Sequence, residues 1–345
     1  GRQIALRAPF ANNRIDPALF SPAAVNLAKR LPSSTDPCGE ITYSRTLDSD
    51  EWQAVTRVDY QAGANNSIFG RYMATAFEQP APFSKSDNVL TTGAGGVGLD
   101  TFAQSATVGN TRVFGANTVN AVRFAFNRSS VHRGNPPFFE ARDLGAKLYN
   151  YSPNKEMTVN VTGGFSILGG TQTVGIFDTN TYQVSDDLTL VRGNHQLAVG
   201  LNMAYWRMHF LTNGRSGGDW QFTGGITGLG MADLMIGRVA RLEHGGPGDL
   251  PMDMWYSGVY AQDSWRMTSR VTVNAGLRWE PYLGQRVLRD HGVTAFDRDN
   301  FRNNVRSAVF LNAPAGLLYS GDAGFPSGDT GLHTQWMNFS PRIGI

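Results

Sequence analysis

The chain has 345 residues, of which 41% are hydrophobic and 17% charged, and its formal net charge is +2. This balance disfavours intrinsic disorder, which combines low hydrophobicity with high net charge, and a nucleic-acid-binding protein, which would carry a basic patch. The sequence has no apolar run long enough for a transmembrane helix, and its single cysteine, Cys38, cannot form an internal disulfide.

The first fifty residues predict a loop segment with a short helix. Asp16 can cap a helix that has Pro17 at its first position. Apolar residues then recur at roughly helical spacing until Leu31 and Pro32, so a helix is expected over about 16–30. Residues 1–30 lack the apolar segment of a signal peptide.

From residue 51 onward, strand-like stretches come in pairs joined by short turns. The pairs are 54–60 with 67–73, 104–114 with 118–127, 182–191 with 195–206, and 255–266 with 271–282. The pairs are separated by long connections rich in Gly, Asn, Asp and Pro, notably 74–103, 128–181 and 283–335. Connections of this length are uncommon in compact soluble domains and indicate either function or disorder.

Alternation of apolar and polar residues is clearest in residues 195–206. Leu197 and Leu201 share one face, whereas Asn202 lies on the other. A period of two indicates a half-buried strand, and strands of about ten to twelve residues match a bilayer core better than the five or six usual in globular proteins. Residue Asp186 interrupts the apolar face of the preceding stretch.

Two stretches have faces that the sequence does not assign. In one of them Asp263 shares a face with Val259, and in the other Arg71 shares a face with Phe69.

Polar side chains inside the strand patterns are expected to point into a polar lumen, because an arginine facing lipid would cost about 2–4 kcal/mol at the midplane. These residues could contact a solute or form ion pairs between neighbouring strands. The candidates are Arg57, Asp59, Arg123, Gln183, Asp187, Gln196, Asn202, Asn274, Arg278 and Glu280.

Aromatic residues near the strand ends predict girdles at the two membrane interfaces, although aromatics are also enriched in strands generally. The girdle candidates are Trp206, Trp255, Tyr256, Trp265, Trp279 and Tyr282.

The remaining motifs predict no metal, cofactor or catalytic site. Gly93 to Gly98 matches a dinucleotide-binding pattern, but the preceding residues form a poor strand and no amphipathic helix follows. The six histidines lack metal-ligand spacing, and the cluster at Asp297 and Asp299 lacks the glycine and distant glutamate of a calcium loop. We therefore do not expect an enzyme.

Short turns on one side and long loops on the other are typical of a bacterial outer-membrane β-barrel. The sequence therefore predicts an all-β fold: an antiparallel transmembrane β-barrel with short periplasmic turns and long extracellular loops. Residues 1–50 would be an extracellular loop segment, and 51–345 would form about nine strands of the barrel.

Four segments, one of which is a hairpin made of two strands, resemble TonB-dependent outer-membrane receptors. Residues 256–265 (YSGVYAQDSW) and 271–280 (VTVNAGLRWE) resemble the "Y…QDxW…LTLNxGLRYE" hairpin, and residues 232–237 (ADLMIG) resemble an "ADFLLG" segment. Residues 13–17 (NRIDP) and 338–344 (NFSPRIG) resemble a loop and an "FxPRxGF" strand of the Oar-like branch of that family.

The resemblance implies a 22-stranded barrel with an N-terminal plug that actively transports a solute across the bacterial outer membrane. Long extracellular loops would capture the ligand before it passes through the barrel. The implied partners are the TonB–ExbB–ExbD complex, outer-membrane lipids and an unidentified solute, with no cofactor and no nucleic acid. No position matches a plug or TonB-box residue, so the plug, the TonB box and the signal peptide are expected outside this portion of the barrel.

Two other functions stay open at this point. One is a passive porin or outer-membrane adhesin that uses the same loops. The other is a secreted carbohydrate-binding β-sandwich, in which the face with Leu197 and Leu201 would be a buried core. In the barrel interpretation, about nine strands would leave two unpaired edges, which lipid does not tolerate, so these residues alone are not expected to insert as a stable monomer.

Overall fold

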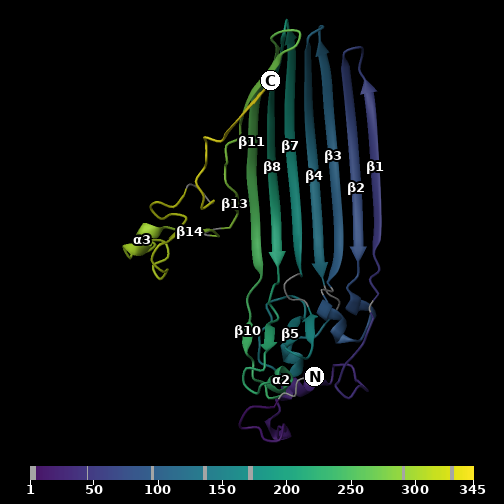
Figure 1. Cartoon of the computed structure of the whole chain (residues 1–345), viewed down its shortest axis with the longest axis vertical. Coiled ribbons are helices and arrows are strands. Elements are labelled where there is room, and N and C mark those ends of the chain that lie inside the picture. Colours follow the sequence, from purple (N-terminus) through teal and green to yellow (C-terminus); the bar gives the residue numbers. More distant parts are fainter. Residues whose placement is uncertain are drawn as a thin grey trace.

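The computed structural model describes residues 5–44, 46–94, 97–134, 138–169, 174–289, 292–326 and 330–345. Its main element is a tall antiparallel sheet, and a smaller folded unit lies at one end of that sheet (Figure 1). Within these residues no helix is both long and apolar enough to cross a membrane. The long sheet confirms a mostly β, antiparallel architecture.

The long sheet follows the chain in the order β1-β2-β3-β4-β7-β8-β11-β12-β16, and β13 pairs with β11 off this path. All of these pairs are antiparallel. The strands are β1 (Asp50–Gln61), β2 (Asn66–Gln79), β3 (Gly98–Phe114), β4 (Thr118–Gly134), β7 (Gly175–Arg192), β8 (His195–Thr212), β11 (Gly248–Arg266), β12 (Thr272–Trp279), β13 (Arg286–Val287) and β16 (Phe339–Gly344). Among the described residues, β1 and β16 are the two edges and the sheet is not closed.

The four predicted hairpins are present, and their short turns all lie at one end of the sheet, at the top of Figure 1. The tightest turn joins β7 to β8, where Gly193 has a φ of 60°. Only glycine adopts this left-handed conformation without strain, which fits a two-residue hairpin connection.

The long strands exceed the predicted ten to twelve residues. β3 and β4 have 17 residues, β7 and β8 have 18, and β11 has 19. In β8 the additional residues lie at the end opposite the hairpin turns, where the alternating apolar pattern stops at Tyr205 and Arg207 follows. Backbone pairing needs no alternation of side chains, so the ladder continues beyond the part that the sequence pattern reveals.

A second, compact unit lies at the end of the sheet opposite the turns (Figure 1), and we call it the loop unit. It contains a four-stranded sheet in the order β10-β9-β5-β6, in which β5 and β9 are parallel. Its strands and helices are β5 (Met157–Val161), β6 (Ser166–Gly169), β9 (Asp219–Phe222), β10 (Arg241–Glu243), α1 (Pro22–Ala28), α2 (Gly230–Met235) and the 3₁₀ helices η1 (Pro17–Leu19), η2 (Pro82–Lys85), η3 (Val89–Ala94) and η4 (Ala141–Leu144). A separate hairpin of β14 (Thr294–Phe296) and β15 (Leu317–Tyr319) with α3 (Arg298–Arg302) projects beside the long sheet.

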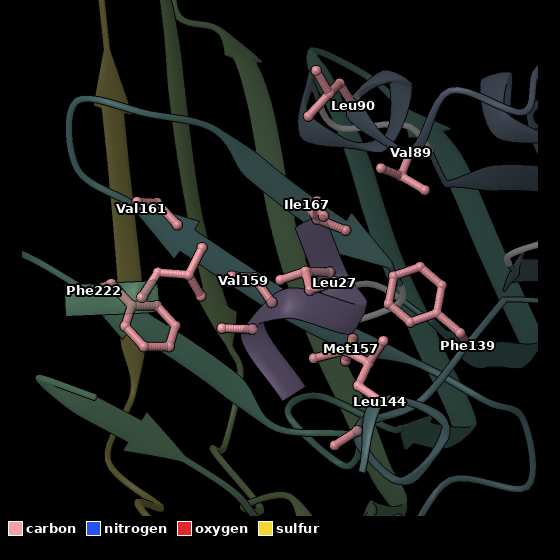
Figure 2. Close-up of a cluster of buried hydrophobic side chains, with 13 residues drawn as sticks. Leu27, Val89, Leu90, Phe139, Leu144, Met157, Val159, Val161, Ile167 and Phe222 are labelled. Carbon is pink, nitrogen blue, oxygen red and sulfur yellow. The ribbon is translucent and has the colours of Figure 1, made fainter. Parts of the chain in front are cut away.

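The main hydrophobic core lies in the loop unit rather than in the long sheet. Leu27 from α1 packs with Val159 of β5, Ile167 of β6 and Phe222 of β9 (Figure 2). The described parts of the β2–β3, β4–β7 and β8–β11 connections meet the N-terminal segment in this cluster, so these parts of the long loops are folded.

The N-terminal helix differs from the single helix expected over 16–30. Asp16 accepts a hydrogen bond from the Ala18 amide and caps η1, but the chain is extended at Phe20 and Ser21 before α1 starts at Pro22. A residue that precedes proline is disfavoured in the helical conformation, which divides the predicted helix into two short pieces.

The register gives the long sheet one apolar and one polar face. Partners in an antiparallel ladder place their side chains on the same side, and the apolar face carries large side chains that are exposed, such as Val58 at 67% and Phe124 at 59%. Further exposed members are Tyr60, Tyr72, Val108, Tyr182, Leu188, Leu197, Val199, Trp255, Val259 and Leu277. No second sheet covers this face within the described residues, which argues against the β-sandwich.

The register also resolves the faces that the sequence left open. Asp263 lies on the apolar face opposite Leu197, and Arg71 lies on the polar face opposite Thr107. Asp186 is on the apolar face as expected, where it accepts a hydrogen bond from the Asn120 side chain.

Glu156 is a buried carboxylate at the start of β5. The residue is 1% exposed, and neither of its carboxylate oxygens has a hydrogen-bond partner among the described residues. Burial raises the pKa of Glu156 from 4.5 to about 7. The Ser152 side chain and the Gly217 amide lie nearby and offset part of the rise, although their geometry falls short of a hydrogen bond. Burial in the loop unit therefore favours the protonated, uncharged form of the Glu156 carboxyl group.

We expect the Glu156→Gln substitution to remove a pH dependence of the stability of the loop unit. Because the pKa is raised on folding, the contribution of Glu156 to the stability of the loop unit is fully present below pH 4.5 and is lost as the pH rises through about 7. The loss amounts to about 3 kcal/mol at most, from the shift in pKa. Hydrogen exchange of the β5 and β9 amides at pH 5 and pH 8 measures it.

Glu40→Gln, at an exposed position of the N-terminal segment, is the control and should exchange like the parent protein. An equal pH dependence of exchange in the parent and in Glu156→Gln would contradict the assignment.

Candidate functional site: the polar face of the long sheet

The structure places all ten predicted lumen-facing residues on one face of the long sheet. Direct register partners connect Asp187 of β7 through Gly200 and Tyr260 to Arg278 of β12. The other members follow from the same ladders: Arg57, Asp59, Arg123, Gln183, Gln196, Asn202, Asn274 and, one residue beyond β12, Glu280.

The centre of this face is a hydrogen-bonded cluster around Asp187. Arg123 of β4 donates from Nη1 to Asp187 Oδ2 at 2.9 Å, and the Tyr260 hydroxyl of β11 donates to Asp187 Oδ1 at 2.7 Å. The Tyr260 ring crosses β8 at Gly200, where a Cβ would overlap the ring and lie 2.8 Å from Asp187 Oδ1. A glycine in the middle of this strand therefore makes room for the cluster.

A second cluster joins β11 to β12. Arg278 donates from Nη2 to the Tyr256 hydroxyl at 2.6 Å and pairs with Glu280 at 2.8 Å, and the Tyr256 hydroxyl donates to Glu280. Gly258 lies beneath, and a Cβ at this position would be 2.6 Å from the Arg278 guanidinium. As at Gly200, a glycine in the strand therefore leaves space for a large side chain that lies across it.

The third cluster lies at the β1 edge. Arg57 donates two hydrogen bonds to Asp59, at 2.8 and 2.7 Å. Its guanidinium lies 4.5 Å from the centre of the Phe69 ring, and that ring covers Gly109 of β3, where a Cβ would overlap it.

These ion pairs hold the face together only weakly. The Arg123 and Asp187 side chains are 46% and 37% exposed, and exposed pairs of this kind contribute about 0–1 kcal/mol each. Their main effect is to keep charged groups paired and fixed along a surface that water can reach.

Several polar side chains on this face are not engaged by protein groups. Within the described residues, Gln183, Gln196, Asn202 and Asn274 form no side-chain hydrogen bond, and Arg71 and Arg342 have no ion-pair partner. These groups can hydrogen-bond to a polar or anionic solute that moves along the face.

The aromatic candidates divide between the two faces. Trp255, Trp265 and Trp279 lie on the apolar face, as a membrane girdle requires. The girdle prediction is wrong for Trp206 and Tyr256, because register places both on the polar face. Tyr282 lies outside the strands and forms a bridge with Gln335.

Sequence reasoning missed a continuous row of aromatic side chains on the apolar face, which we call the aromatic row. It consists of Phe126, Tyr182, Tyr205 and Trp255, which are register partners on four neighbouring strands. Successive ring centres are 5.2, 6.5 and 4.8 Å apart. Only Trp255 was among the predicted girdle residues, because the row depends on register between hairpins.

The other motifs do not form sites in the described part of the chain. No group of three or more His, Cys, Asp or Glu side chains that could hold a metal ion occurs there, and His291 lies outside it. The glycine-rich motif begins within η3 and ends at the first residue of β3, so a helix precedes it and a strand follows, the reverse of the order that a dinucleotide site needs. Its Gly95 and Gly96 also lie outside the described residues.

Comparison with known families gives one result. A family model described as an outer membrane beta barrel domain matches residues 1–345. No curated protein matches the chain.

We expect Gly200→Ala to destabilise the protein by about 1–3 kcal/mol, because the added methyl group displaces the Tyr260 ring and breaks its hydrogen bond to Asp187. In a Tyr260→Ala background the same substitution should cost much less. Urea unfolding of the four members of this double-mutant cycle measures the coupling.

Gly70→Ala is the matched control, because Gly70 is also in a strand of this sheet but has open space where its Cβ would lie. Equal costs of Gly200→Ala with and without Tyr260 would rule out the packing explanation.

Proposed function

The chain belongs to the outer membrane beta barrel family, and we propose that it acts in TonB-dependent transport of a solute across that membrane. Its location is the bacterial outer membrane. The observation that carries the proposal is the pairing of a polar face, lined by fixed ion pairs and free amides, with a folded loop unit at one end of the same sheet.

The apolar face is the surface that meets lipid. On β8 its apolar stretch runs from Leu197 to Tyr205. Its eight steps of about 3.3 Å span about 26 Å along the strand, or about 20 Å along the membrane normal at a strand tilt of about 40°. Lipid-facing bands of outer-membrane barrels are about 25 Å tall. An exposed apolar surface of this size is stable only in contact with hydrocarbon or another apolar surface.

The polar face then lines the lumen. Arg123, Asp187 and Tyr260 lie at the level of the membrane, and Arg71 carries a charge with no described partner. The loop unit lies beyond the membrane on the side of the long connections, where it can receive a ligand before the ligand enters the lumen. The hairpin turns would face the periplasm.

TonB dependence is supported by the four segments that resemble TonB-dependent receptors, two of which, residues 13–17 and 338–344, resemble the Oar-like branch. Residues 256–265 and 271–280 lie mainly in the β11–β12 hairpin, and residues 338–344 include β16. Residues 232–237 include most of α2, where Asp233 accepts hydrogen bonds from the Thr227 amide and hydroxyl at 2.8 and 2.7 Å.

In this proposal the TonB–ExbB–ExbD complex supplies the energy, and the chain binds and guides the solute without catalysis. The unpaired edges β1 and β16 would each pair with a further strand, because an open edge exposes backbone groups that lipid cannot satisfy. A 22-stranded barrel with a plug, as in TonB-dependent receptors, would meet this requirement.

We expect Val108→Arg to destabilise the membrane-inserted protein by about 2 kcal/mol or more, because Val108 lies on the apolar face among Gly70 and Phe124. Thr111→Arg places the same charge on the polar face of the same strand and should cost far less. Unfolding by urea in lipid vesicles measures both, and equal costs would contradict the assignment of faces.

We expect the loop unit to be extracellular. In a Cys38→Ser background, a cysteine at Tyr149 in the loop unit should react with a membrane-impermeant maleimide on intact cells, whereas a cysteine at Met267 in the β11–β12 turn should not. Both positions are exposed, so after lysis both should react. Labelling of Met267→Cys alone on intact cells would reverse the proposed orientation.

We expect loss of the protein and loss of TonB to impair uptake of the same scarce solutes, and the purified protein to show no steady ion conductance in planar bilayers. A steady conductance together with TonB-independent uptake would establish the passive porin instead.

A further inference from the structure

A basic group lies on the apolar face immediately beyond the aromatic row. Arg128 of β4, Asn180 of β7 and Arg207 of β8 are direct register partners, and we call them the basic triplet. Each lies two residues from a member of the aromatic row on its own strand, on the side of the loop unit. The two arginines are separated by two strand spacings, about 10 Å.

The arginines of the triplet have no hydrogen-bond or ion-pair partner in the described part of the chain, although carboxylates lie nearby. Asp253, opposite Arg207, accepts hydrogen bonds from Arg286 at 2.7 and 2.6 Å and from Tyr205 at 3.0 Å. Asp178 accepts a hydrogen bond from Ser130 at 2.6 Å and lies 3.6 Å from His132. Both carboxylates already have hydrogen-bond partners. Arg207 interacts with Asp253 only through space, without a hydrogen bond or close ion pair, so both guanidinium groups keep their hydrogen-bond donors free.

The position of the triplet relative to the membrane follows from the aromatic row. Aromatic side chains on the lipid-facing surface of a barrel gather at the level of the headgroups. One step further from the apolar band, Arg128 and Arg207 lie among the headgroups themselves. Arginine presents a planar set of donors that matches phosphate oxygens, and the Asn180 amide between the two arginines adds a further donor.

We propose that the basic triplet binds the phosphate of an anionic lipid headgroup, with the acyl chains of that lipid packed against the aromatic row. A phosphate free in water would gain nothing from the exposed rings beneath the triplet, whereas a phospholipid or phosphorylated glycolipid fills both parts of the surface. The assignment of this lipid to the outer leaflet rests on the proposed orientation of the loop unit.

The test is binding of bisphosphorylated lipid A to the purified protein in detergent, followed by native mass spectrometry. The parent protein should bind this lipid at least tenfold more tightly than the same lipid after phosphatase treatment. The double variant Arg128→Gln/Arg207→Gln should bind bisphosphorylated lipid A roughly tenfold more weakly than the parent, because charge-assisted hydrogen bonds are lost.

The matched control is Arg71→Gln/Arg342→Gln, which removes the same charge from the polar face and should leave lipid binding unchanged. The proposal is overturned if the Arg128→Gln/Arg207→Gln variant binds as the parent does, if the control loses as much affinity, or if phosphatase treatment has no effect. Because the assay measures lipid binding and no transport, its failure would leave the proposed transport function untouched, and a failure of transport would leave the triplet untouched.

Discussion

The structure depends on one uninterrupted ladder of backbone hydrogen bonds from β1 to β16. In such a ladder each residue fixes the face of its partner, so a single register determines the side of about 130 side chains at once. A slip of one residue between any two strands would move Asp187 or Arg278 towards lipid and Leu197 or Val199 into the lumen. The energetic contrast between lipid and lumen therefore enforces the register, and the register assembles the site.

Glycine positions on the polar face are part of the same constraint. The Tyr260 and Phe69 rings lie across neighbouring strands, and each does so over a glycine, Gly200 or Gly109. The Tyr260 hydroxyl reaches Asp187 across β8, so this polar cluster joins two hairpins that are distant in sequence, whereas Phe69 contacts Arg57 within its own hairpin. Ion pairs that are individually weak are in this way kept in fixed positions along the lumen.

The loop unit has a different physical basis. Its stability comes from a buried apolar cluster to which the N-terminal helix α1 contributes Leu27, whereas the long sheet has few buried side chains. One protein thus contains a part that needs lipid for its apolar face and a part with a core of its own. Glu156 lies in the second part, where burial raises the pKa of its carboxyl group and we expect stability to depend on pH.

Period-two alternation and the contrast between short turns and long connections were sufficient to predict the hairpins, the two-faced strands and the set of residues on the polar face. These are local properties, because the alternation of apolar and polar residues in a strand can be recognised within about a dozen residues. The sequence did not reveal the full strand lengths, since β8 continues past Tyr205 by backbone pairing alone.

Only tertiary structure decided on which face of the sheet Trp206 and Tyr256 lie. It also decided the contact between Tyr260 and Asp187, the aromatic row and the basic triplet. Each depends on the register between strands of different hairpins, or on the face that a residue takes where the alternation of apolar and polar residues is interrupted. The packing of α1 against β5 and β9 is likewise absent from any local pattern, because it joins residues more than a hundred positions apart. The sequence by itself determined which side chains of one strand share a face. The backbone ladder between strands determined which side chains of different strands are in contact.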